Sequence, residues 1–399
     1  MTRIRRLVRA AMLRLAALSL GLGLACLVLE LAMRLLPVAD PPRVSAVDAA
    51  RPVFHFETDQ GYLWSIGWDF TVVNRGRTNN SGFVNDQDYV RDREQPLLAV
   101  IGDSYVEALM VPFAHTLHGR LAGALAGQVQ VFSLAASGAP LSQYLIWAQH
   151  ARDRFRPDGL AVVVVGNDFD ESLAWYKTGP GFHHFIEAPG GDLTLTRIDY
   201  LPSIAGRLVR RSALARYLAF NLHAHTRALE FGRALAALFD ARAQAAASAP
   251  SQPHADTAPT SAAPRYIGNT AADADAARIA DSLRALDAFL AQLPARAGLP
   301  AARIALIVDA LRPQLYAGPA AVDAVREAYF PQMRKALIER ARRAGFEVLD
   351  LHPAFAAAYR QHAQHFEFET DFHWNAAGHR VAAELLGRSR VLSSLRAGS

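Results

Sequence analysis

The tripeptide Gly102-Asp103-Ser104 follows the apolar run Leu97–Ile101 and places a serine where a strand gives way to a helix. A serine hydroxyl is a poor nucleophile unless a nearby base removes its proton. At the start of a helix, the serine's own backbone N–H points outward and can bind a developing oxyanion. The pattern therefore predicts Ser104 as a nucleophile. A simpler interpretation remains open, in which Ser104 caps the helix and Asp103 closes a turn.

A base for this serine is found close to the C-terminus, in Asp371-Phe372-His373. Asp371 precedes His373 by two residues, so in an extended loop both side chains face the same side. The carboxylate can then orient the imidazole and stabilise its charged form while the ring takes the serine proton. We predict a catalytic set of Ser104, His373 and Asp371. The alternative is a solvated loop, in which Asp and His are common.

Two further residues offer hydrogen-bond donors to a negatively charged oxygen. Gly138, in Ser137-Gly138-Ala139-Pro140, follows the apolar run Val129–Leu134, and Asn167 follows another such run. The backbone N–H of Gly138 and the side-chain amide of Asn167, together with the N–H of Ser104, predict an oxyanion hole. Each residue taken alone is equally typical of an ordinary turn.

The C-terminal part also contains enough histidines and aspartates for a metal site. Candidate ligands are Asp371, His373 and His379, with Asp350, His352 and His365 nearby. Ligation requires these side chains to converge on one point, whereas the serine-centred set explains more of the positions, so we expect no metal. His379 is the second choice as the base. Because it falls within a predicted helix, a packing or capping role fits it better.

Five apolar runs alternate with amphipathic stretches and predict the scaffold. Uninterrupted apolar strands flanked by helices are typical of a parallel sheet covered on both faces. Sites in such sheets form at the carboxyl ends of the strands, which is where the residues above are expected. The predicted strands are Leu97–Ile101, Val129–Leu134, Leu160–Val165, Ile304–Val308 and Glu347–Leu349; the predicted helices lie near 112–126, 141–155, 276–293, 320–344 and 376–388.

In sequence order, the serine, glycine, asparagine and histidine of this set resemble the four blocks that give the SGNH (GDSL-type) esterases and acyltransferases their name. The matching positions are Ser104, Gly138, Asn167 and His373. The resemblance covers about residues 80–386, with one long interruption. It implies a flavodoxin-like three-layer α/β/α sandwich with a parallel sheet, and the same nucleophile, base and oxyanion hole.

Three short stretches refine the resemblance. Asn80-Ser81-Gly82-Phe83 and Ser142-Gln143-Tyr144 look like those of membrane-anchored bacterial members. In this family the last sequence block is commonly D-x-x-H, whereas this chain has Asp371-Phe372-His373-Trp374. The shorter D-x-H-W form is similar to relatives of the alginate-type O-acetyltransferases. It leaves open whether water or a sugar hydroxyl accepts the acyl group.

Arginines dominate the N-terminus and are followed by an apolar run. The uncharged run Leu15–Leu29 extends to Leu15–Met33, close to the ~20 residues that a bilayer requires. We predict an uncleaved transmembrane anchor over 15–33, with a cleaved signal peptide as the alternative. The arginine excess predicts that residues 1–14 are cytoplasmic and the body is exported, in a bacterium an inner-membrane protein with a periplasmic catalytic domain.

Composition excludes several other classes of protein. The 399 residues are 51% hydrophobic and 20% charged, as in a folded chain. The net charge is only +5, and no basic cluster is interleaved with aromatics, so we expect no nucleic-acid partner. The single cysteine, Cys26, excludes an intramolecular disulfide and a thiolate-rich zinc site. A lipoprotein needs a leucine three residues before the cysteine, where Gly23 stands.

The predicted organisation places a linker and a small β region at 34–94 and the catalytic domain at 95–392. A helical insertion at 169–275 includes a Gly-, Phe- and His-rich loop, Gly179–Gly191, and a helical stretch over Ser203–Arg242. That stretch is expected to pack on the domain, with a lid or a membrane-surface element as the alternative. The Ala-, Ser- and Pro-rich segment 241–264 is expected to be a disordered linker.

We therefore predict an exported, membrane-tethered serine esterase of the SGNH type that cleaves carboxylic esters, in particular acetyl esters of a glycan, without a metal or organic cofactor. One alternative is an O-acetyltransferase that moves acetyl groups onto an extracellular or cell-wall polysaccharide, with a separate membrane protein as acyl donor. Another is a non-catalytic glycan-binding protein that keeps the fold.

Overall fold

The fold is described from a computed structural model, which describes residues 2–224, 269–270, 272–312 and 314–397. The chain divides into two compact units. The first consists of Met1–Pro41, Leu63–Asn74 and Ser203–Ala258, and the second of Pro42–Tyr62, Arg75–Pro202 and Pro259–Ser399.

A parallel five-stranded sheet forms the centre of the second unit. Each predicted strand is present within one residue of its expected ends. The strand order β4-β3-β5-β8-β9 becomes 2-1-3-4-5 when these strands are counted along the chain, which is the flavodoxin-like order. The predicted fold class is thus confirmed. The strands are β3 (Leu97–Gly102), β4 (Gln130–Ala135), β5 (Gly159–Val164), β8 (Ile304–Val308) and β9 (Glu347–Asp350).

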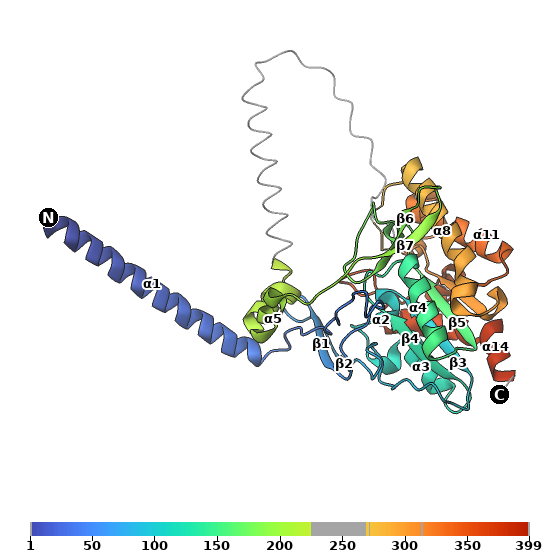
Figure 1. Cartoon of the computed structure of the whole chain (residues 1–399), viewed down its shortest axis with the longest axis horizontal. Coiled ribbons are helices and arrows are strands. Elements are labelled where there is room, and N and C mark those ends of the chain that lie inside the picture. Colours follow the sequence, from blue (N-terminus) through green and yellow to red (C-terminus); the bar gives the residue numbers. More distant parts are fainter. Residues whose placement is uncertain (1, 225–268, 271, 313, 398–399) are drawn as a thin grey trace, which may run out of the picture. The chain divides into compact units, whose positions relative to one another are not determined.

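Helices cover both faces of this sheet (Figure 1). Successive strand residues point to opposite faces, so Ala99 and Ile101 pack into one core and Leu98 and Val100 into the other. Both sets are fully buried, which explains why the strands read as uninterrupted apolar runs. The first core includes residues of α4 (Leu141–Arg154), α8 (Ala276–Ala297) and α11 (Tyr329–Arg343); the second includes residues of α3 (Leu117–Ala124), α12 (Leu351–His362), α13 (Ala376–Gly387) and α14 (Arg390–Ala397).

The helix expected over 320–344 is two helices, α10 (Pro319–Ala324) and α11. Pro331 explains the break, because a proline inside a helix clashes with the preceding turn but is tolerated in the first one. The chain therefore restarts its helix at Tyr329, two residues before the proline. Helices α12 and α14 were not expected. Each buries only two or three residues, which is too weak a pattern to identify.

An antiparallel hairpin of β6 (His183–Glu187) and β7 (Leu193–Arg197) lies where a loop over Gly179–Gly191 was expected. The prediction was wrong because the glycines at its edges are turn residues of a hairpin, with Gly191 at φ +86°. Gln143 fixes the start of β6, since its Oε1 accepts the N–H of His183 (2.9 Å).

The predicted linker 241–264, and the helical stretch from 225 onwards, lie outside the described residues.

The first unit contains the long helix α1 (Thr2–Arg34) and the short helices α5 (Ile204–Arg211) and α6 (Ala213–Arg216). Over Leu7–Arg34, α1 is long and apolar enough to span a membrane or to be a signal sequence. Asn221 ties the unit together: its Oδ1 accepts the N–H of Ala39 (3.0 Å) and its Nδ2 donates to Ser65 Oγ (2.7 Å). In the region expected to be β, strands β1 (Gly61–Ile66) and β2 (Val72–Arg77) form a two-stranded sheet.

Candidate active site

Ser104 is the first residue of α2 (Ser104–Glu107), which begins directly after β3. Asp103 caps this helix, with its Oδ1 accepting the N–H of Tyr105 (2.9 Å). A side chain at Gly102 would overlap Val106, so the glycine lets the helix start tightly against the strand. The capping role that the sequence also allowed for Ser104 belongs to Asp103, and the serine hydroxyl is left to other partners.

The structure brings Ser104 and His373 together although 269 positions separate them in the sequence. Oγ of Ser104 lies 2.7 Å from Nε2 of His373, a hydrogen-bond distance. On the other side of the ring, Nδ1 is 3.2 Å from Oδ1 of Asp371, close but without the alignment of a hydrogen bond. The same Oδ1 accepts the backbone N–H of His373 (2.9 Å), which fixes the carboxylate beside the ring. The His373 side chain is 29% exposed, so a substrate can reach it.

A buried ion pair holds the loop that carries His373. Arg312 and Asp309 are both fully buried and joined by a 2.7 Å contact from Nη2 to Oδ2. Arg312 also donates to the carbonyl of Phe372 (3.1 Å), and Asp309 accepts the indole N–H of Trp374 (2.9 Å). The residues before and after His373 are therefore each bound to one member of the pair. Tyr105, next to Ser104, adds a third hydrogen bond to this loop, from its hydroxyl to the Phe372 carbonyl (2.6 Å).

Nearby carboxylates tune the histidine. Burial lowers the pKa of His373, but the Asp371 and Asp103 carboxylates outweigh this effect and raise it above its ordinary value near 6.5. Burial would raise the pKa of Asp371, yet the adjacent imidazole and the backbone N–H of His373 lower it below its ordinary value. Burial raises the pKa of Asp103 to about 6. At neutral pH the imidazole thus lies beside two carboxylates that stabilise its protonated form.

Glu107 connects the serine helix to the loop that contains Gly138. Its carboxylate, on α2, accepts the backbone N–H of Ser137 (2.9 Å) and the Ser137 hydroxyl. Gly138 follows at φ +77°, a conformation that favours glycine, although the space around it is open. Burial raises the pKa of Glu107 to about 7. The backbone after β4 is therefore held in place by a buried glutamate from the neighbouring element.

The Asn167 amide is held from both ends. Its Nδ2 donates to Oε2 of Glu171 (2.9 Å), and its Oδ1 accepts a hydrogen bond from Nδ2 of Asn269. Asn269 also accepts the N–H of Gly166 (2.6 Å), and Glu171 forms an ion pair with Lys177 (2.6 Å). Because a side-chain amide has two N–H groups, the bond to Glu171 leaves Asn167 one further donor.

Strand order explains why these loops converge. Ser104, Gly138 and Asn167 follow β3, β4 and β5, which are neighbours in the sheet and end at the same edge. Successive strands are added on one side of β3 up to β4 and on its other side from β5 onwards, and ligands of open α/β sheets bind at such a switch point. The arrangement is suited to acyl transfer. An oxyanion hole of Ser104, Gly138 and Asn167 stays a prediction.

The side chains considered as metal ligands have other roles. The buried His379 accepts the N–H of Leu117 at Nδ1 (3.1 Å) and packs edge-on against Trp374, and burial lowers its pKa well below the ordinary value. Asp350 caps α12 and pairs with Arg334. Within the described residues no group of three or more His, Cys, Asp or Glu side chains is placed to hold a metal.

Sequence reasoning missed the residues that position the site rather than form it. No motif contains any of these residues, which are Glu107, Asp309, Arg312 and Asn269. The hydrogen-bond partners of Glu107 and Asn269 lie 30 or more positions away in the sequence. Asp309 offered one signal, because an acidic residue directly after an apolar strand lies at the functional edge of a parallel sheet.

The fold and the site define a class: an α/β protein of flavodoxin-like topology with a hydrogen-bonded serine and histidine at the switch point. No family model and no curated protein matches this chain. Among solved structures, it is similar to a member of the lipolytic protein G-D-S-L family from Veillonella parvula (10% identity, 72% of this chain and 94% of that chain covered, TM-score 0.34). It is also similar to a lipase/acylhydrolase from Enterococcus faecalis (11% identity, 76% and 97% covered, TM-score 0.34) and to a lipase from a goat rumen metagenome (12% identity, 74% and 100% covered, TM-score 0.36).

Replacing Arg312 should destabilise the protein strongly. Arg312→Met leaves the Asp309 carboxylate buried without its cation, which costs about 3–5 kcal/mol of unfolding free energy. Urea denaturation measures this loss. The matched control is Arg326→Met, which breaks an exposed pair with Asp323 and should leave the unfolding free energy nearly unchanged. Equal effects of the two substitutions would contradict a structural role for the buried pair.

The pH dependence of ester hydrolysis should reveal the raised pKa of His373. Only the neutral imidazole accepts a proton, so kcat/KM should fall as pH drops through a value above 6.5. Asp371→Asn removes the carboxylate that raises this pKa, so the midpoint should move to lower pH. The plateau kcat should also fall, by roughly 10²–10⁴-fold, because the imidazolium loses its counter-charge. A midpoint that stays in place would show that Asp371 does not act on His373.

Removing the Glu107 carboxylate should lower turnover more than substrate binding. Glu107→Ala frees the loop after β4, and kcat should fall by roughly 10–100-fold with KM little changed, somewhat less than the loss of a whole oxyanion donor. Glu107→Gln keeps an acceptor for the Ser137 N–H and should restore most of the activity. Glu339→Ala, an exposed glutamate on α11, serves as the control. A loss in KM alone would assign Glu107 to substrate binding.

Proposed function

We propose that the protein hydrolyses carboxylic esters through an acyl-enzyme on Ser104. The observation that carries this proposal is the 2.7 Å distance from the Ser104 hydroxyl to Nε2 of His373, with Asp371 behind the ring. A neutral imidazole at that distance removes the serine proton as the oxygen attacks a carbonyl carbon. The raised pKa of His373 supports its role as an effective base.

The reaction follows in two balanced halves. First, Oγ of Ser104 bonds to the acyl carbon and its proton moves to Nε2 of His373. The ester C–O bond then breaks as the same proton passes to the departing alcohol, which leaves an acyl-serine. In the second half, water gives its proton to His373 and attacks the acyl carbon. The carboxylic acid departs as the proton returns to Ser104.

We infer that backbone and amide N–H groups stabilise the negative oxygen formed in each half. The N–H of Ser104 belongs to the first helical position, where it has no partner inside the helix. Gly138 supplies a second N–H from the loop that Glu107 holds, and the remaining N–H of Asn167 supplies a third. Preorganised donors of this kind lower the barrier because they need not reorient during the reaction.

We further propose that α1 anchors the protein in the bacterial inner membrane with the catalytic unit in the periplasm, and that the substrate is an acetylated glycan. The length and apolar character of α1 and the arginines that precede its apolar run support the anchor. The D-x-H-W form of the last block favours a second function, O-acetyl transfer to a polysaccharide hydroxyl, with a membrane protein supplying the acyl group. Both functions share the acyl-serine and differ only in the acceptor.

Serine-directed labelling tests the shared step. The full chain in detergent micelles should react with a fluorophosphonate at Ser104, and Ser104→Ala should abolish both labelling and release of acetate from p-nitrophenyl acetate. Ser394→Ala, which removes an exposed hydroxyl on α14, is the matched control and should retain both. Full labelling of Ser104→Ala would refute Ser104 as the nucleophile. No labelling of the native chain would refute the acyl-enzyme and favour a non-catalytic glycan-binding protein.

The two residues of the pair should behave as one unit in mutational tests. Ser104→Ala and His373→Ala should each lower kcat by roughly 10⁴–10⁶-fold, and the double variant should be scarcely worse than either single one. Measurement of acetate release by all three variants gives the coupling. A double variant that loses the product of the two single effects would contradict the joint role.

Added soluble glycans then separate the two functions, because a transferase converts acetate release into acetylated sugar.

A further inference from the structure

The first unit presents an apolar surface beside the end of α1. We infer that α5 and its neighbours form a membrane-interface collar, defined here as Leu35, Trp68, Ile204 and Leu208 with Arg207 and Arg211, which lies in the headgroup region of the bilayer that holds α1. This inference rests on the proposed membrane anchor and is independent of the proposed ester hydrolysis.

Glu30 attaches α5 and α6 to the last turns of α1. Its carboxylate accepts hydrogen bonds from Ser212 Oγ (2.7 Å), from Ala213 N (3.1 Å) and from Leu214 N (2.9 Å). These are the residues at which α6 begins, so the carboxylate binds the N-terminal N–H groups of that helix. If α1 spans the bilayer, Glu30 and Arg34 stand where it leaves the hydrocarbon. The segment attached there lies at the same depth.

One side of α5 is bound to the unit and the opposite side is not covered. Arg210 forms an ion pair with Asp40 (3.2 Å) and donates to the carbonyl of Pro41 (2.8 Å). Successive helical residues turn by about 100°, so Leu208 lies nearly opposite Arg210, with Ile204 beside it. Ile204 is 69% exposed and Leu208 58% exposed. No residue of this helix is buried.

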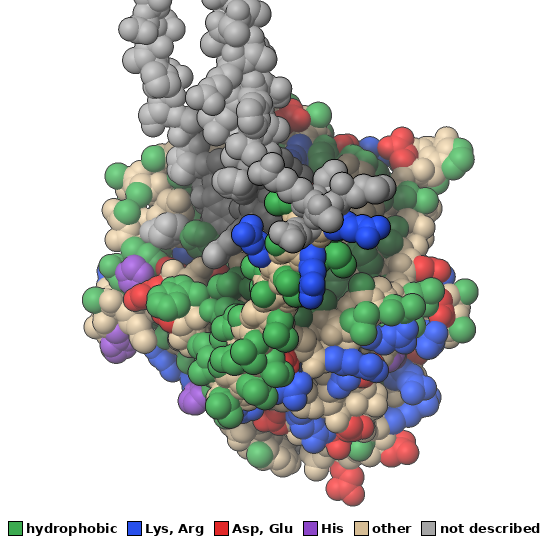
Figure 2. All heavy atoms as spheres, turned by 90° about the vertical axis from the view of Figure 1, so that its left-hand side faces the viewer, with side chains coloured by type: hydrophobic (Ala, Val, Ile, Leu, Met, Phe, Trp, Pro, Cys, Tyr) green, Lys and Arg blue, Asp and Glu red, His purple; other side chains and the backbone are tan. Residues whose placement is uncertain are grey.

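Two further apolar side chains of the same unit are exposed near these elements. Leu35 directly follows α1 and is 89% exposed, and Trp68 is 74% exposed. The Trp68 carbonyl accepts the hydroxyl hydrogen of Tyr217, which follows α6 directly. Figure 2, which looks from the α1 side, shows hydrophobic and basic side chains next to each other on this face. Exposed apolar side chains gathered in this way mark an interaction surface.

Charge and chemistry identify a phospholipid bilayer as the occupant. Arg207 and Arg211 lie together along one edge of the apolar side of α5 and are exposed, as arginines that reach anionic headgroups must be. The acidic Asp40 is neutralised by Arg210 and Arg216, which leaves the collar basic. Tryptophan is enriched at membrane interfaces because its ring is apolar and its N–H polar. The surface is also continuous with the helix proposed to enter the membrane, which a docking protein would not require.

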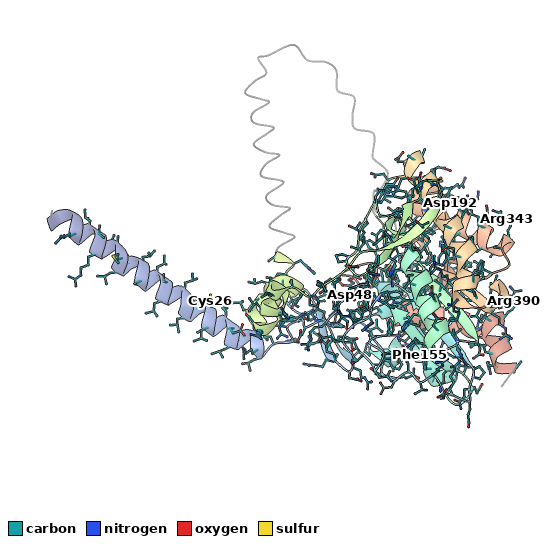
Figure 3. All side chains as sticks on the ribbon, viewed as in Figure 1. Cys26, Asp48, Phe155, Asp192, Arg343 and Arg390 are labelled. Carbon is teal, nitrogen blue, oxygen red and sulfur yellow. The ribbon has the colours of Figure 1, made fainter. Side chains whose placement is uncertain are left out.

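Fluorescent labelling of single cysteines in the full chain tests this inference. Cys26 is exposed on α1, and Figure 3 labels it together with Arg343 on the second unit. Three proteins carry an environment-sensitive dye: the native chain at Cys26, Cys26→Ser/Leu208→Cys, and Cys26→Ser/Arg343→Cys. Each is reconstituted in vesicles of phosphatidylcholine and phosphatidylglycerol, and quenching by spin-labelled lipid is compared with quenching by aqueous iodide. Thermal unfolding checks that the variants keep the fold.

We expect lipid quenching and loss of iodide quenching at Cys26 and at position 208, and the reverse at 343. Iodide quenching at 208 equal to that at 343, with Cys26 protected, would overturn the collar while leaving the anchor intact. Iodide quenching at Cys26 would overturn the anchor and the collar together. Neither outcome bears on acetate release, which reports the proposed hydrolysis.

A charge-reversed variant tests the choice of lipid. Adding Arg207→Glu and Arg211→Glu to the protein labelled at 208 should cause a loss of lipid quenching in vesicles that contain phosphatidylglycerol. The matched control is Arg342→Glu/Arg343→Glu on the second unit, which should change nothing at 208. Unaltered quenching after reversal of the collar arginines would contradict recognition of anionic headgroups.

Discussion

The buried contact between Arg312 and Asp309 is the interaction on which the site depends. Asp309 directly follows β8 of the central sheet, and Arg312 comes three residues later. Together they bind the Phe372 carbonyl and the Trp374 indole, on either side of His373. The imidazole is therefore held in a fixed position relative to the sheet. Apolar side chains of similar size are often as stabilising in a core as a buried ion pair. An ion pair, however, requires its two side chains to keep one specific geometry. The geometry that it demands here points an imidazole at Ser104. Burial acts against the charge on Arg312, and the carboxylate of Asp309 more than restores it, so the pKa of Arg312 lies above its ordinary value.

The sheet edge around this contact concentrates buried acids. Asp103, Glu107 and Asp168 all lie there, and burial raises the pKa of each above its ordinary value. Each of them accepts one backbone N–H close to the site, from Tyr105, Ser137 and Val165 respectively. Desolvation of three carboxyl groups is unfavourable, and the loops they fix are those expected to surround a substrate. The buried carboxyl groups thus lower the folding stability but fix the arrangement of the N–H donors, as in many active sites.

Much of this architecture could be predicted from local sequence. The five strands appear as uninterrupted apolar runs because both faces of the sheet are buried, and that signal is local to each strand. The site serine, glycine and asparagine each follow such a run, so their shared edge could be inferred from the class of fold. The hairpin of β6 and β7 could not, since its alternation is interrupted by His183, His184 and the glycines around it.

The residues that position the site could not be predicted from the sequence for a different reason. Glu107 and Asn269 each act through two hydrogen bonds to residues distant in the chain, and a lone acid or amide carries no periodicity. The break between α10 and α11 could in principle be predicted, because Pro331 stands inside the run for which the sequence predicts one helix. The ionisation of His373 depends on two carboxylates at different sequence distances, Asp371 two positions away and Asp103 270 positions away. Only the folded chain places both beside the ring.

The long separation between Ser104 and His373 has a consequence for the order of events during synthesis. Ser104, Gly138 and Asn167 have all been synthesised soon after β5, yet His373 is added only with the loop before α13. A ribosome-bound chain therefore holds a serine without its base for most of its synthesis. Chemistry begins when the last helices dock, which ties the onset of reactivity to completion of the polypeptide.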